Sequence, residues 1–485
     1  MHSSLDTIFV LQGTWPRCHI DMQDSVRLEA EIRFDLKGLD MDSKLLPEDW
    51  KIATLGEVAK CRNGAGIKQD FFSDSGVPLA RVSDFTSESI NLVNCIRIDE
   101  DHAKLWQTHV LCEGDILVAT VGSWPPNWSS VVGKVVRVPK NAVGSIQNQN
   151  TACLVAYPDK AEQNFLYYLL KTSDFIYWAA NSAHGSANQA RIAVQNLEKY
   201  SFKIPPLPEQ RAIARILGSL DDKIEANRRM NDTLEAMSRT LFKSWFVDFE
   251  PVRARAEGRA PAGMDAETAA LFPYGFEDSE IGDVPHGWMV RPIGEVVNVL
   301  GGGTPSTKDI SYWEGGTHSF CTPKDMSSLT SPVLLNTERY LTDKGLAKVN
   351  SGQLPIGTVL MSSRAPIGYL AISEIPVSIN QGIIAMVCDK ELPNLYVLQW
   401  TQANMEGFIA VANGSTFLEI SKWNFRPIKA LVPPPQVLKE FSRAIEPIYF
   451  QIINNLRQSQ VLMQLRDVLL QQLISGGIPV NGRDA

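Results

Sequence analysis

The sequence predicts an α+β protein in which two similar globular domains are separated by a long antiparallel helix pair (a coiled coil) with pseudo-twofold symmetry. Two stretches of the chain keep a 3.5-residue apolar period for more than four heptads, as paired helices do. Each stretch follows a β-rich segment with many loops. The whole unit, of about 200 residues, occurs twice in the same order.

Residues 1–43 differ from the rest of the chain because they hold no sustained apolar period. They contain Met1, Met22 and Met41, so this leader is either an ordered extension or precedes a start at one of the later methionines. We expect the leader to be poorly ordered or artefactual.

The first globular domain is predicted over residues 44–207. Short β-rich runs alternate with loops, among them GVPLARVSDF, GDILVATVGSW and QNTACLVAYPD. The run NFLYYLLKTSDFIYWAA then predicts a helix. A polar segment, HGSANQARIAVQNLEKYSFKIPPLPEQ, leads into the first long helix.

The first long helix is predicted over residues 208–250. Pro208 suits a first helical turn, and Pro251 cannot continue the helix. A helix of this length extends roughly 60 Å and buries its narrow apolar stripe against a partner helix. The seam residues alternate by four and three: Ile213, Leu217, Leu220, Ile224, Asn227, Asn231, Leu234, Ser238, Leu241 and Trp245.

The second domain is predicted over residues 288–435, after an Ala-, Pro- and Gly-rich linker at 251–287 with about one helical turn. Phrases of the first domain recur in it in the same order. WKIATLGEV returns as WMVRPIGEV, GDILVATVGSW as GTVLMSSRAPIG, and SIQNQNTACLVA as SINQGIIAMVC. The copies differ most in the loops, as expected for domains that bind two different ligands.

The second long helix is predicted over residues 436–475, before a tail at 476–485. We expect the two helices to be antiparallel, with Asn227 opposite Ser459 and Asn231 opposite Asn455 in a central polar layer. Pro447 cannot donate to the helix ladder, which predicts a kink or a restart of the helix there. The seam repeats that of the first helix: Ile445, Ile448, Ile452, Asn455, Ser459, Leu462, Leu469 and Leu473.

Composition narrows the class of protein. With 485 residues and 44% hydrophobic content, the chain can form two or three domains. It shows no signal peptide and no apolar run of the roughly 18 residues that span a membrane, so no membrane partner is expected. The seven cysteines are scattered without a C-x-x-C pair, which favours reduced thiols in the cytoplasm. The net charge of −8 argues against a protein that binds nucleic acid by itself, although a local basic surface can still do so.

The sequence predicts neither a catalytic site nor a metal site. It holds no G-x-x-x-x-G-K-[ST] phosphate loop, and the glycine-rich run at 301–305 lacks the lysine that would follow. The Trp-Pro-Pro-Asn-Trp run at 124–128 lacks the flanking residues of an amino-methyltransferase site. Paired carboxylates for Mg²⁺ do not recur between the copies, and His184 is isolated.

Short polar loops are better candidates, for binding rather than for catalysis. In both copies they combine a cation with hydroxyl and amide groups, which are the groups that contact bases and phosphates in DNA. A single polar loop of this kind is usually an ordinary solvent-exposed turn, and an Asn or Gln before a strand can have a structural role. Because such loops recur at equivalent places in both copies, a binding role is favoured for the whole set. The first-domain candidates are Lys68, Gln69, Arg81, Ser83, Ser123, Asn148 and Gln149. The second-domain candidates are Thr304, Ser306, Thr307, Lys308, Lys324, Ser362, Ser363, Arg364, Asn380 and Gln381.

Several phrases between residues 45 and 475 resemble those of a known family. They are LPEDWKIATLGEV, the segment from PPLPEQRAIARILGS to SWFVDFEPV, GGGTPSTKDISYWEGG, SSRAPIGYLAIS and SINQGI. With them the chain resembles the specificity (S) subunits of type I restriction–modification systems. The leader before Met41 and the proline within the second helix depart from the family pattern.

The resemblance implies two target-recognition domains, each reading one half of a bipartite sequence in double-stranded DNA. The helices would set the spacer between the halves and dock modification (methyltransferase) subunits, two of them. Cleavage would belong to restriction subunits, which are ATP-dependent translocases and nucleases. The chain itself would be no enzyme and would bind no cofactor, with S-adenosylmethionine, ATP and Mg²⁺ held by the partner subunits. The polar loops would be the DNA contacts.

Other interpretations stay open. The same module could serve a modification-only or phage-defence assembly, which the gene neighbourhood would distinguish. A tandem-domain coiled-coil scaffold that binds peptides or sugars is an alternative of a different class. An enzyme with a site at the domain–helix junction is disfavoured, because no nucleophile, metal set or phosphate loop recurs in the sequence.

Overall fold

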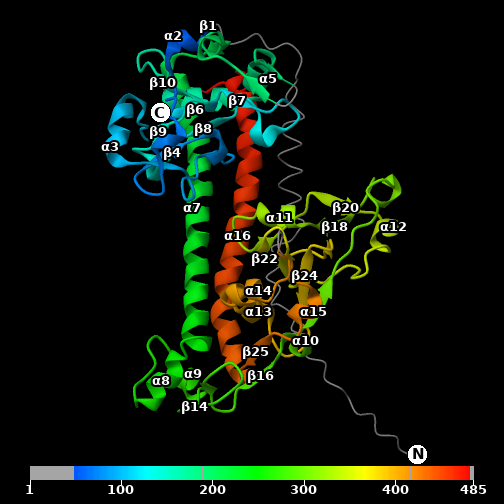
Figure 1. The fold of residues 1–485 in the computed structure, drawn as a ribbon. Coiled ribbons are helices and arrows are strands. Elements are labelled where there is room, and N and C mark those ends of the chain that lie inside the picture. The colour runs from blue at the N-terminus through cyan, green and yellow to red at the C-terminus, as the bar shows by residue number, and fades with distance from the viewer. Residues whose placement is uncertain (1–48, 187–188, 415–417, 481–485) are drawn as a thin grey trace, which may run out of the picture. The chain divides into compact units, whose positions relative to one another are not determined.

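The chain forms two compact units, coloured by residue number in Figure 1. The computed structural model describes residues 49–186, 189–414 and 418–480. The first unit consists of residues 1–215 and 470–485, and the second unit consists of residues 216–469. The predicted leader at 1–43 lies outside the described residues, as do residues 481–485 of the predicted tail.

The first unit is built on a four-stranded antiparallel sheet in the order β2–β10–β6–β8. Every residue of β6 is buried, as expected for a short apolar run inside a sheet. Helix α4 (Gln163–Leu170) packs against this sheet and buries the six residues from Phe165 to Leu170. The strands are β2 (Ala59–Asn63), β6 (Ile116–Ala119), β8 (Val135–Arg137) and β10 (Thr151–Ala156).

Smaller sheets complete this unit, in the orders β3–β5–β4–β9, β11–β12–β7 and β1–β13. Their strands are β1 (Lys51–Thr54), β3 (Phe72–Ser73), β4 (Val77–Ala80), β5 (Arg97–Ile98), β7 (Val121–Gly122), β9 (Ile146–Gln147), β11 (His184–Ser186), β12 (Gln189–Arg191) and β13 (Ser201–Ile204). The other helices are α2 (Leu55–Val58), α3 (Glu100–Ala103), α5 (Ser173–Asn181) and α6 (Val194–Leu197).

Helix α7 (Leu207–Phe246) begins three residues after β13 and is anchored to the first domain by Gln210. The Gln210 side chain is buried and donates to the Pro205 carbonyl at 2.8 Å. Its amide oxygen accepts from the backbone N–H of Glu162 at 2.9 Å. Because both ends of a buried amide are paired, the start of α7 is fixed to its domain.

The globular domain of the second unit repeats this plan. A five-stranded sheet in the order β17–β24–β21–β22–β19 is accompanied by a three-stranded sheet, β20–β18–β23, and by the pair β16–β25. The strands are β16 (Met289–Pro292), β17 (Asn298–Gly301), β18 (His318–Cys321), β19 (Val333–Leu334), β20 (Arg339–Leu341), β21 (Val359–Ser363), β22 (Ile367–Ser373), β23 (Ser378–Ile379), β24 (Ile383–Val387) and β25 (Lys429–Val432). The helices are α10 (Ile293–Val296), α11 (Pro323–Ser327), α12 (Asp343–Leu346), α13 (Asn394–Ala403), α14 (Met405–Ala410) and α15 (Lys422–Phe425).

Matching backbone hydrogen bonds show that the two domains share one fold. The bond from Gly56 N to Glu198 O in the first domain corresponds to that from Gly294 N to Arg426 O in the second. Three further pairs correspond in the same way: Ala65–Gln147 with Gly303–Ile379, Asn148–Ala80 with Asn380–Cys321, and Ile192–Thr120 with Ile420–Ser363. The duplication predicted from repeated phrases is therefore a duplication of structure.

Helices α7 and α16 (Pro435–Ile474) run antiparallel within the second unit, as predicted. Asn227 Nδ2 donates to the Ser459 hydroxyl at 3.2 Å, and Asn455 Nδ2 donates to Asn231 Oδ1 at 2.8 Å. Both predicted contacts of the polar layer are confirmed. Asn227, Asn231 and Asn455 are at most 5% exposed, so each amide replaces its lost water with a partner across the seam.

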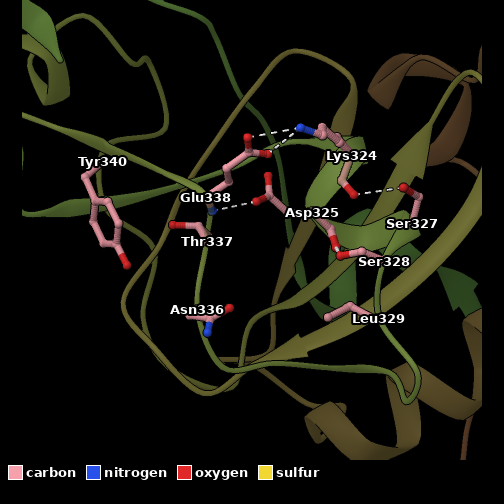
Figure 2. Close-up of a pocket in the computed structure, with 9 residues that line it drawn as sticks. All are labelled: Lys324, Asp325, Ser327, Ser328, Leu329, Asn336, Thr337, Glu338 and Tyr340. Carbon is pink, nitrogen blue, oxygen red and sulfur yellow. Dashed lines mark hydrogen bonds and ion pairs between the residues drawn. The ribbon is translucent and has the colours of Figure 1, made fainter. Parts of the chain in front are cut away.

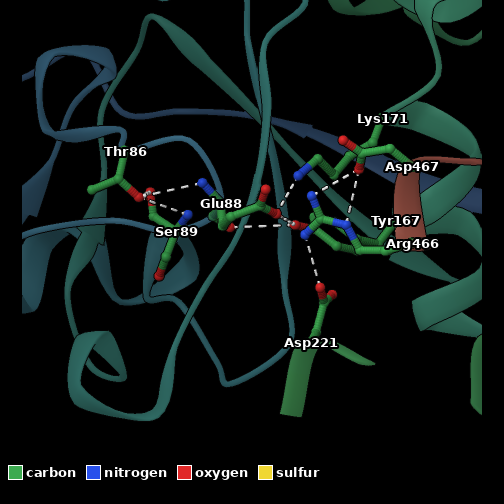
Figure 3. A network of polar contacts seen from close by, with 8 residues as sticks. All are labelled: Thr86, Glu88, Ser89, Tyr167, Lys171, Asp221, Arg466 and Asp467. Atoms are coloured by element: carbon green, nitrogen blue, oxygen red, sulfur yellow. Dashed lines mark hydrogen bonds and ion pairs between the residues drawn. The ribbon is translucent and has the colours of Figure 1, made fainter. Parts of the chain in front are cut away.

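The apolar part of the seam is buried or half-buried at every predicted position in the second unit. One buried position holds Arg466, which donates to Asp221 at 2.9 Å and to its chain neighbour Asp467 at 2.9 Å (Figure 3). Helix α16 is continuous across Pro447, so the predicted restart of the helix does not occur.

The end of α7 differs from the prediction. The helix ends at Phe246 rather than at Glu250, and Glu250 begins α8 (Glu250–Ala256) with Pro251 in the first turn. The break lies at Phe249, whose φ of 54° is left-handed and cannot continue a right-handed helix. A proline in a first turn loses no hydrogen bond, so Pro251 helps to start a helix rather than only ending one.

Residues 251–287 hold more structure than the predicted linker with one helical turn. Besides α8 they form α9 (Ala266–Ala270), β14 (Phe276–Glu277) and β15 (Val284–Pro285). Val252, Phe272 and Val284 are buried in one cluster with Trp288 of the second domain. A few apolar side chains thus fix this segment, although its composition is that of a linker. None of the described helices combines the length and apolar character that crossing a membrane requires.

Candidate nucleic-acid interface

In the second domain, one group of the predicted polar residues is brought together by a close backbone approach at Gly302. A Cβ atom at Gly302 would lie 1.9 Å from the carbonyl oxygen of Ile379, so only glycine fits. This approach places the loop after β17 beside the loop between β23 and β24. The Thr304 hydroxyl then donates to the side-chain oxygen of Gln381.

Arg364 joins the same group from the turn between β21 and β22. The Ser363 N–H donates to the Gly382 carbonyl at 2.8 Å, and a Cβ at Gly382 would lie 3.4 Å from Arg364 Nε. The same Cβ would lie 3.3 Å from Asn380 Oδ1 and 3.1 Å from Pro323 at the start of α11. We call Thr304, Arg364, Asn380 and Gln381 the domain-2 polar patch; α11 adjoins it.

Lys324 follows Pro323 and lines a pocket of about 550 Å³ (Figure 2). Its ammonium group forms an ion pair with the Glu338 carboxylate at 2.7 Å. This bond raises the pKa of Lys324 above its ordinary value, because Glu338 stabilises the charged ammonium. The pocket is lined by Lys324, Asp325, Ser327, Ser328, Leu329, Asn336, Thr337, Glu338 and Tyr340.

Two predicted contacts of the second domain are buried. Ser362 and Ser363 are at most 3% exposed. The Ser362 hydroxyl donates to the Pro366 carbonyl and accepts from the Tyr369 N–H, both at 2.8 Å. These two serines therefore shape the turn that carries Arg364. The other three candidates, Ser306, Thr307 and Lys308, are exposed on the loop that leads to residue 310.

In the first domain, a close backbone approach at a glycine also brings candidate residues together. A Cβ at Gly64 would lie 1.9 Å from the Asn148 carbonyl oxygen, which matches Gly302 in the second domain. A Cβ at Gly66 would lie 3.2 Å from Gln149 Oε1, so the loop that continues to exposed Lys68 and Gln69 passes beside Gln149. Asn148 itself is 8% exposed, and its Oδ1 accepts from the backbone of Asn150, which makes it a turn-forming amide.

Arg81, Ser83 and Ser123 already have partners inside the first unit. Arg81 forms an ion pair with Asp84 at 3.4 Å, and Asp84 also accepts from the Arg81 N–H at 2.9 Å. The Ser83 hydroxyl donates to Asp84 at 3.1 Å. Ser123 donates to the Asn127 carbonyl at 3.0 Å and contacts the Ser130 hydroxyl. In the same unit Lys171 pairs with Glu88, beside Tyr167 (Figure 3).

Sequence reasoning missed a pair of antiparallel segments next to each loop group. In the first domain β12 pairs with both β11 and β7 and exposes Gln189 and Arg191. In the second domain Asn413 and Glu419 are paired at the equivalent place, and Glu419 forms an ion pair with Arg364 at 3.6 Å. The signal was present in the sequence as a polar, glycine-containing run that recurs before each long helix.

Chemically, the candidate residues that the structure describes offer hydrogen-bond donors and acceptors. Burial raises the pKa of the Cys61 and Cys153 thiols to about 12, so neither is a thiolate nucleophile at neutral pH. Among the residues that the structure describes, no group of three or more His, Cys, Asp or Glu side chains could hold a metal ion. The cations Arg81, Lys324 and Arg364 each have a carboxylate partner, so an anionic ligand would have to compete for them.

Comparisons with known proteins agree on one family. The model of the type I restriction modification DNA specificity domain matches twice, over residues 47–236 and 285–461. The MjaIX specificity subunit of a type I restriction enzyme from Methanocaldococcus jannaschii is 31% identical, over 93% of this chain and 98% of the relative. The HindI specificity subunit from Haemophilus influenzae is 26% identical, over 65% of this chain and 77% of the relative.

A solved structure shows the same fold. The S subunit of a type I restriction–modification system from M. genitalium aligns with a TM-score of 0.51 and 16% sequence identity. The alignment covers 91% of this chain and 99% of that one. At this identity the match supports the architecture of paired domains and long helices.

Proposed function

Because the chain belongs to the family of type I restriction–modification specificity subunits, we propose that it is the non-catalytic subunit that selects the DNA sequence. Each globular domain would read one half of a bipartite target in double-stranded DNA. The observation that carries this proposal is the recurrence of one scaffold with different polar side chains on it. Gly64 and Gly302 fix equivalent loops, and the exposed residues beside them differ between the domains.

The helix pair would set the distance between the two half-sites. This role is supported by the antiparallel pairing of the two helices within the second unit. The polar layer of Asn227, Asn231 and Asn455 holds that pairing in one register. A slip of one heptad would leave buried amides without partners, which costs about 1–3 kcal/mol for each group. A helix pair with a fixed register has a fixed length, and a fixed length is what would hold two half-sites a constant distance apart.

Two methyltransferase subunits would dock on the same helices, and restriction subunits would complete the complex. The described part of α7 in the second unit carries Ile216, Met230 and Met237 on one stripe beside the seam, 37–53% exposed. Apolar residues at a constant heptad position are typical of a helix that packs against further helices. S-adenosylmethionine, ATP and Mg²⁺ would be bound by the partner subunits.

A domain exchange tests the sequence-reading role. Residues 288–430 would be replaced by the corresponding segment of a relative with a different specificity, and the chain would be expressed with its methyltransferase subunits. Single-molecule sequencing of methylated bases should give a bipartite motif in which one half changes and the other half is retained. An unchanged set of methylated sites, with the exchanged chain present in the complex, would contradict the proposal.

A further inference from the structure

The Lys324–Glu338 ion pair lies at the pocket of the second domain, and stability alone does not explain it. The ammonium group lies 2.7 Å from one carboxylate oxygen and 3.0 Å from the other. The two side chains are 76% and 60% exposed, and exposed ion pairs contribute little to the free energy of unfolding. A donor and an acceptor are therefore displayed side by side to solvent.

The backbone beneath this pair is held by a buried carboxylate. Asp325, 9% exposed, accepts from the Glu338 N–H at 2.8 Å through one oxygen. Its other oxygen accepts from the Thr322 N–H at 2.8 Å and from the Thr322 hydroxyl at 2.6 Å. Asp325 thus fixes the start of α11 relative to the loop that carries Glu338 (Figure 2). The backbone that carries the pair is therefore held in place before any ligand arrives, which reduces the entropy cost of binding.

The surroundings of the pair suit a base edge. Pro323, one residue before Lys324, adjoins the domain-2 polar patch at Gly382. Asn336 and Tyr340 line the same pocket, and Tyr340 is 41% exposed. Amide and aromatic side chains next to a charged donor are common where proteins contact bases.

We propose that Lys324 and Glu338 together recognise one G·C base pair in the major groove, within the half-site read by the second domain. Lysine donates to guanine O6 and N7, and glutamate accepts from cytosine N4. O6 and N4 are hydrogen-bonded to each other in the base pair, so they lie about 2.9 Å apart. The ammonium and carboxylate atoms have nearly the same separation, 2.7–3.0 Å, and can face that edge together. This inference rests on the proposed function.

An A·T pair also has an adjacent donor and acceptor, but it fits less well. Guanine offers the lysine two neighbouring acceptors, whereas the usual partner of an adenine edge is a single amide of Asn or Gln. The described part of the first domain has a different arrangement at the equivalent place. There Asp84 takes the place of Asp325, but Asp84 is itself the ion-pair partner of Arg81. The two domains therefore present different sets of donors and acceptors. The half-sites should therefore differ at this position.

The test uses the complex of the full chain with its methyltransferase subunits. Lys324→Met and Glu338→Ala would be compared with the wild type by sequencing methylated bases and by competition binding to duplexes with one base pair changed. We expect one G·C position of the second-domain half-site to relax, with discrimination falling roughly ten- to hundredfold. The half-site read by the first domain should be unchanged.

The matched control is a second ion pair of the same unit, Lys429–Glu280 at 2.9 Å, in which Glu280 is exposed and Lys429 is half-buried. Lys429→Met and Glu280→Ala should leave the motif unchanged, and thermal unfolding should show all four variants folded. Relaxation at an A·T position, or an unchanged motif in both Lys324→Met and Glu338→Ala, would overturn the inference while leaving the proposed function standing. Absence of any bipartite motif in the wild-type complex would overturn both.

Discussion

At the scale of single residues, Glu235 on α7 is a charged group in an unfavourable place. Its side chain is largely buried, and Oε1 has no hydrogen-bond partner among the described atoms. Burial raises the pKa of this carboxyl above its ordinary value; a hydrogen bond from Ser331 and the charge of Arg239, 3.7 Å away, oppose that rise only in part. The folded protein therefore holds the Glu235 proton to a higher pH than the unfolded chain does.

Glu235→Gln should stabilise the protein at neutral pH. With a folded pKa above the unfolded one, Glu235 makes the free energy of unfolding fall as the pH rises through the interval between the two values. Glutamine does not titrate, so its advantage should be largest at pH 7.5 and should shrink as the pH is lowered towards 4.5. The measurement is the urea midpoint of the full chain as a function of pH.

Glu225 on the same helix provides a control of opposite sign. Hydrogen bonds from Arg228, at 2.7 and 2.8 Å, are the largest cause that lowers its pKa. Its stabilising contribution is therefore present at neutral pH and is lost on acidification. Glu225→Gln should lower the free energy of unfolding at pH 7.5 by less than about 1 kcal/mol for so exposed a pair, and should lower the urea midpoint slightly. If the difference in urea midpoint between variant and wild type has the same sign and the same pH dependence for Glu235→Gln and Glu225→Gln, burial is not the cause of the Glu235 effect.

At the scale of elements, the long helices were predictable because their information is local and periodic. A 3.5-residue repeat determines which face of α7 is buried, and the polar positions of the two seams predicted which residues face each other in the antiparallel pairing. The end of α7 was not predictable from Pro251, since the break lies at Phe249, which has a left-handed backbone and whose ring packs against Phe276 and Trp288.

The candidate site was only partly predictable, because it is made by contacts between loops. Lys324 and Arg364 stood out as cations in polar loops, but nothing in the sequence links them to Glu338 or Glu419. Those pairings depend on the fold around Asp325 and Gly382. In the same way, Ser362 resembles a surface hydroxyl in sequence and is a buried structural group in the turn.

The exposed apolar stripe of α7 gives a prediction for docking. Met237 is 53% exposed, and its neighbour Ala236 is exposed on an adjoining face of the helix. Met237→Asp should weaken association with methyltransferase subunits roughly ten- to hundredfold, because a buried methionine is worth about 1.5–3 kcal/mol and the new carboxylate would be desolvated. Ala236→Asp adds the same charge and costs slightly more in helix propensity, because alanine is the best helix former. Analytical sedimentation of each variant with the methyltransferase subunits measures the affinity of association. An equal loss of affinity in Met237→Asp and Ala236→Asp would mean that the docking surface lies elsewhere.

At the scale of the whole molecule, the proposed function makes the length of the helix pair a measurable quantity. The polar layer fixes the register, so length can be changed only by inserting whole heptads into both helices at facing positions. One heptad would be added to α7 between Leu220 and Ile224, and one to α16 between Leu462 and Arg466. The two sites face each other in the antiparallel pairing that Asn227 and Ser459 define.

Each inserted heptad lengthens a helix by about 10 Å, which equals about three base pairs of B-DNA. We expect sequencing of methylated bases to show the same two half-sites with a gap widened by up to about three base pairs. Seven residues inserted after Gly258, in the exposed turn between α8 and α9, lengthen the chain without lengthening the helix pair and should leave the gap unchanged. A gap that stays constant in the heptad variant, or that widens in the turn variant, would mean that the distance between half-sites is set by something other than α7 and α16.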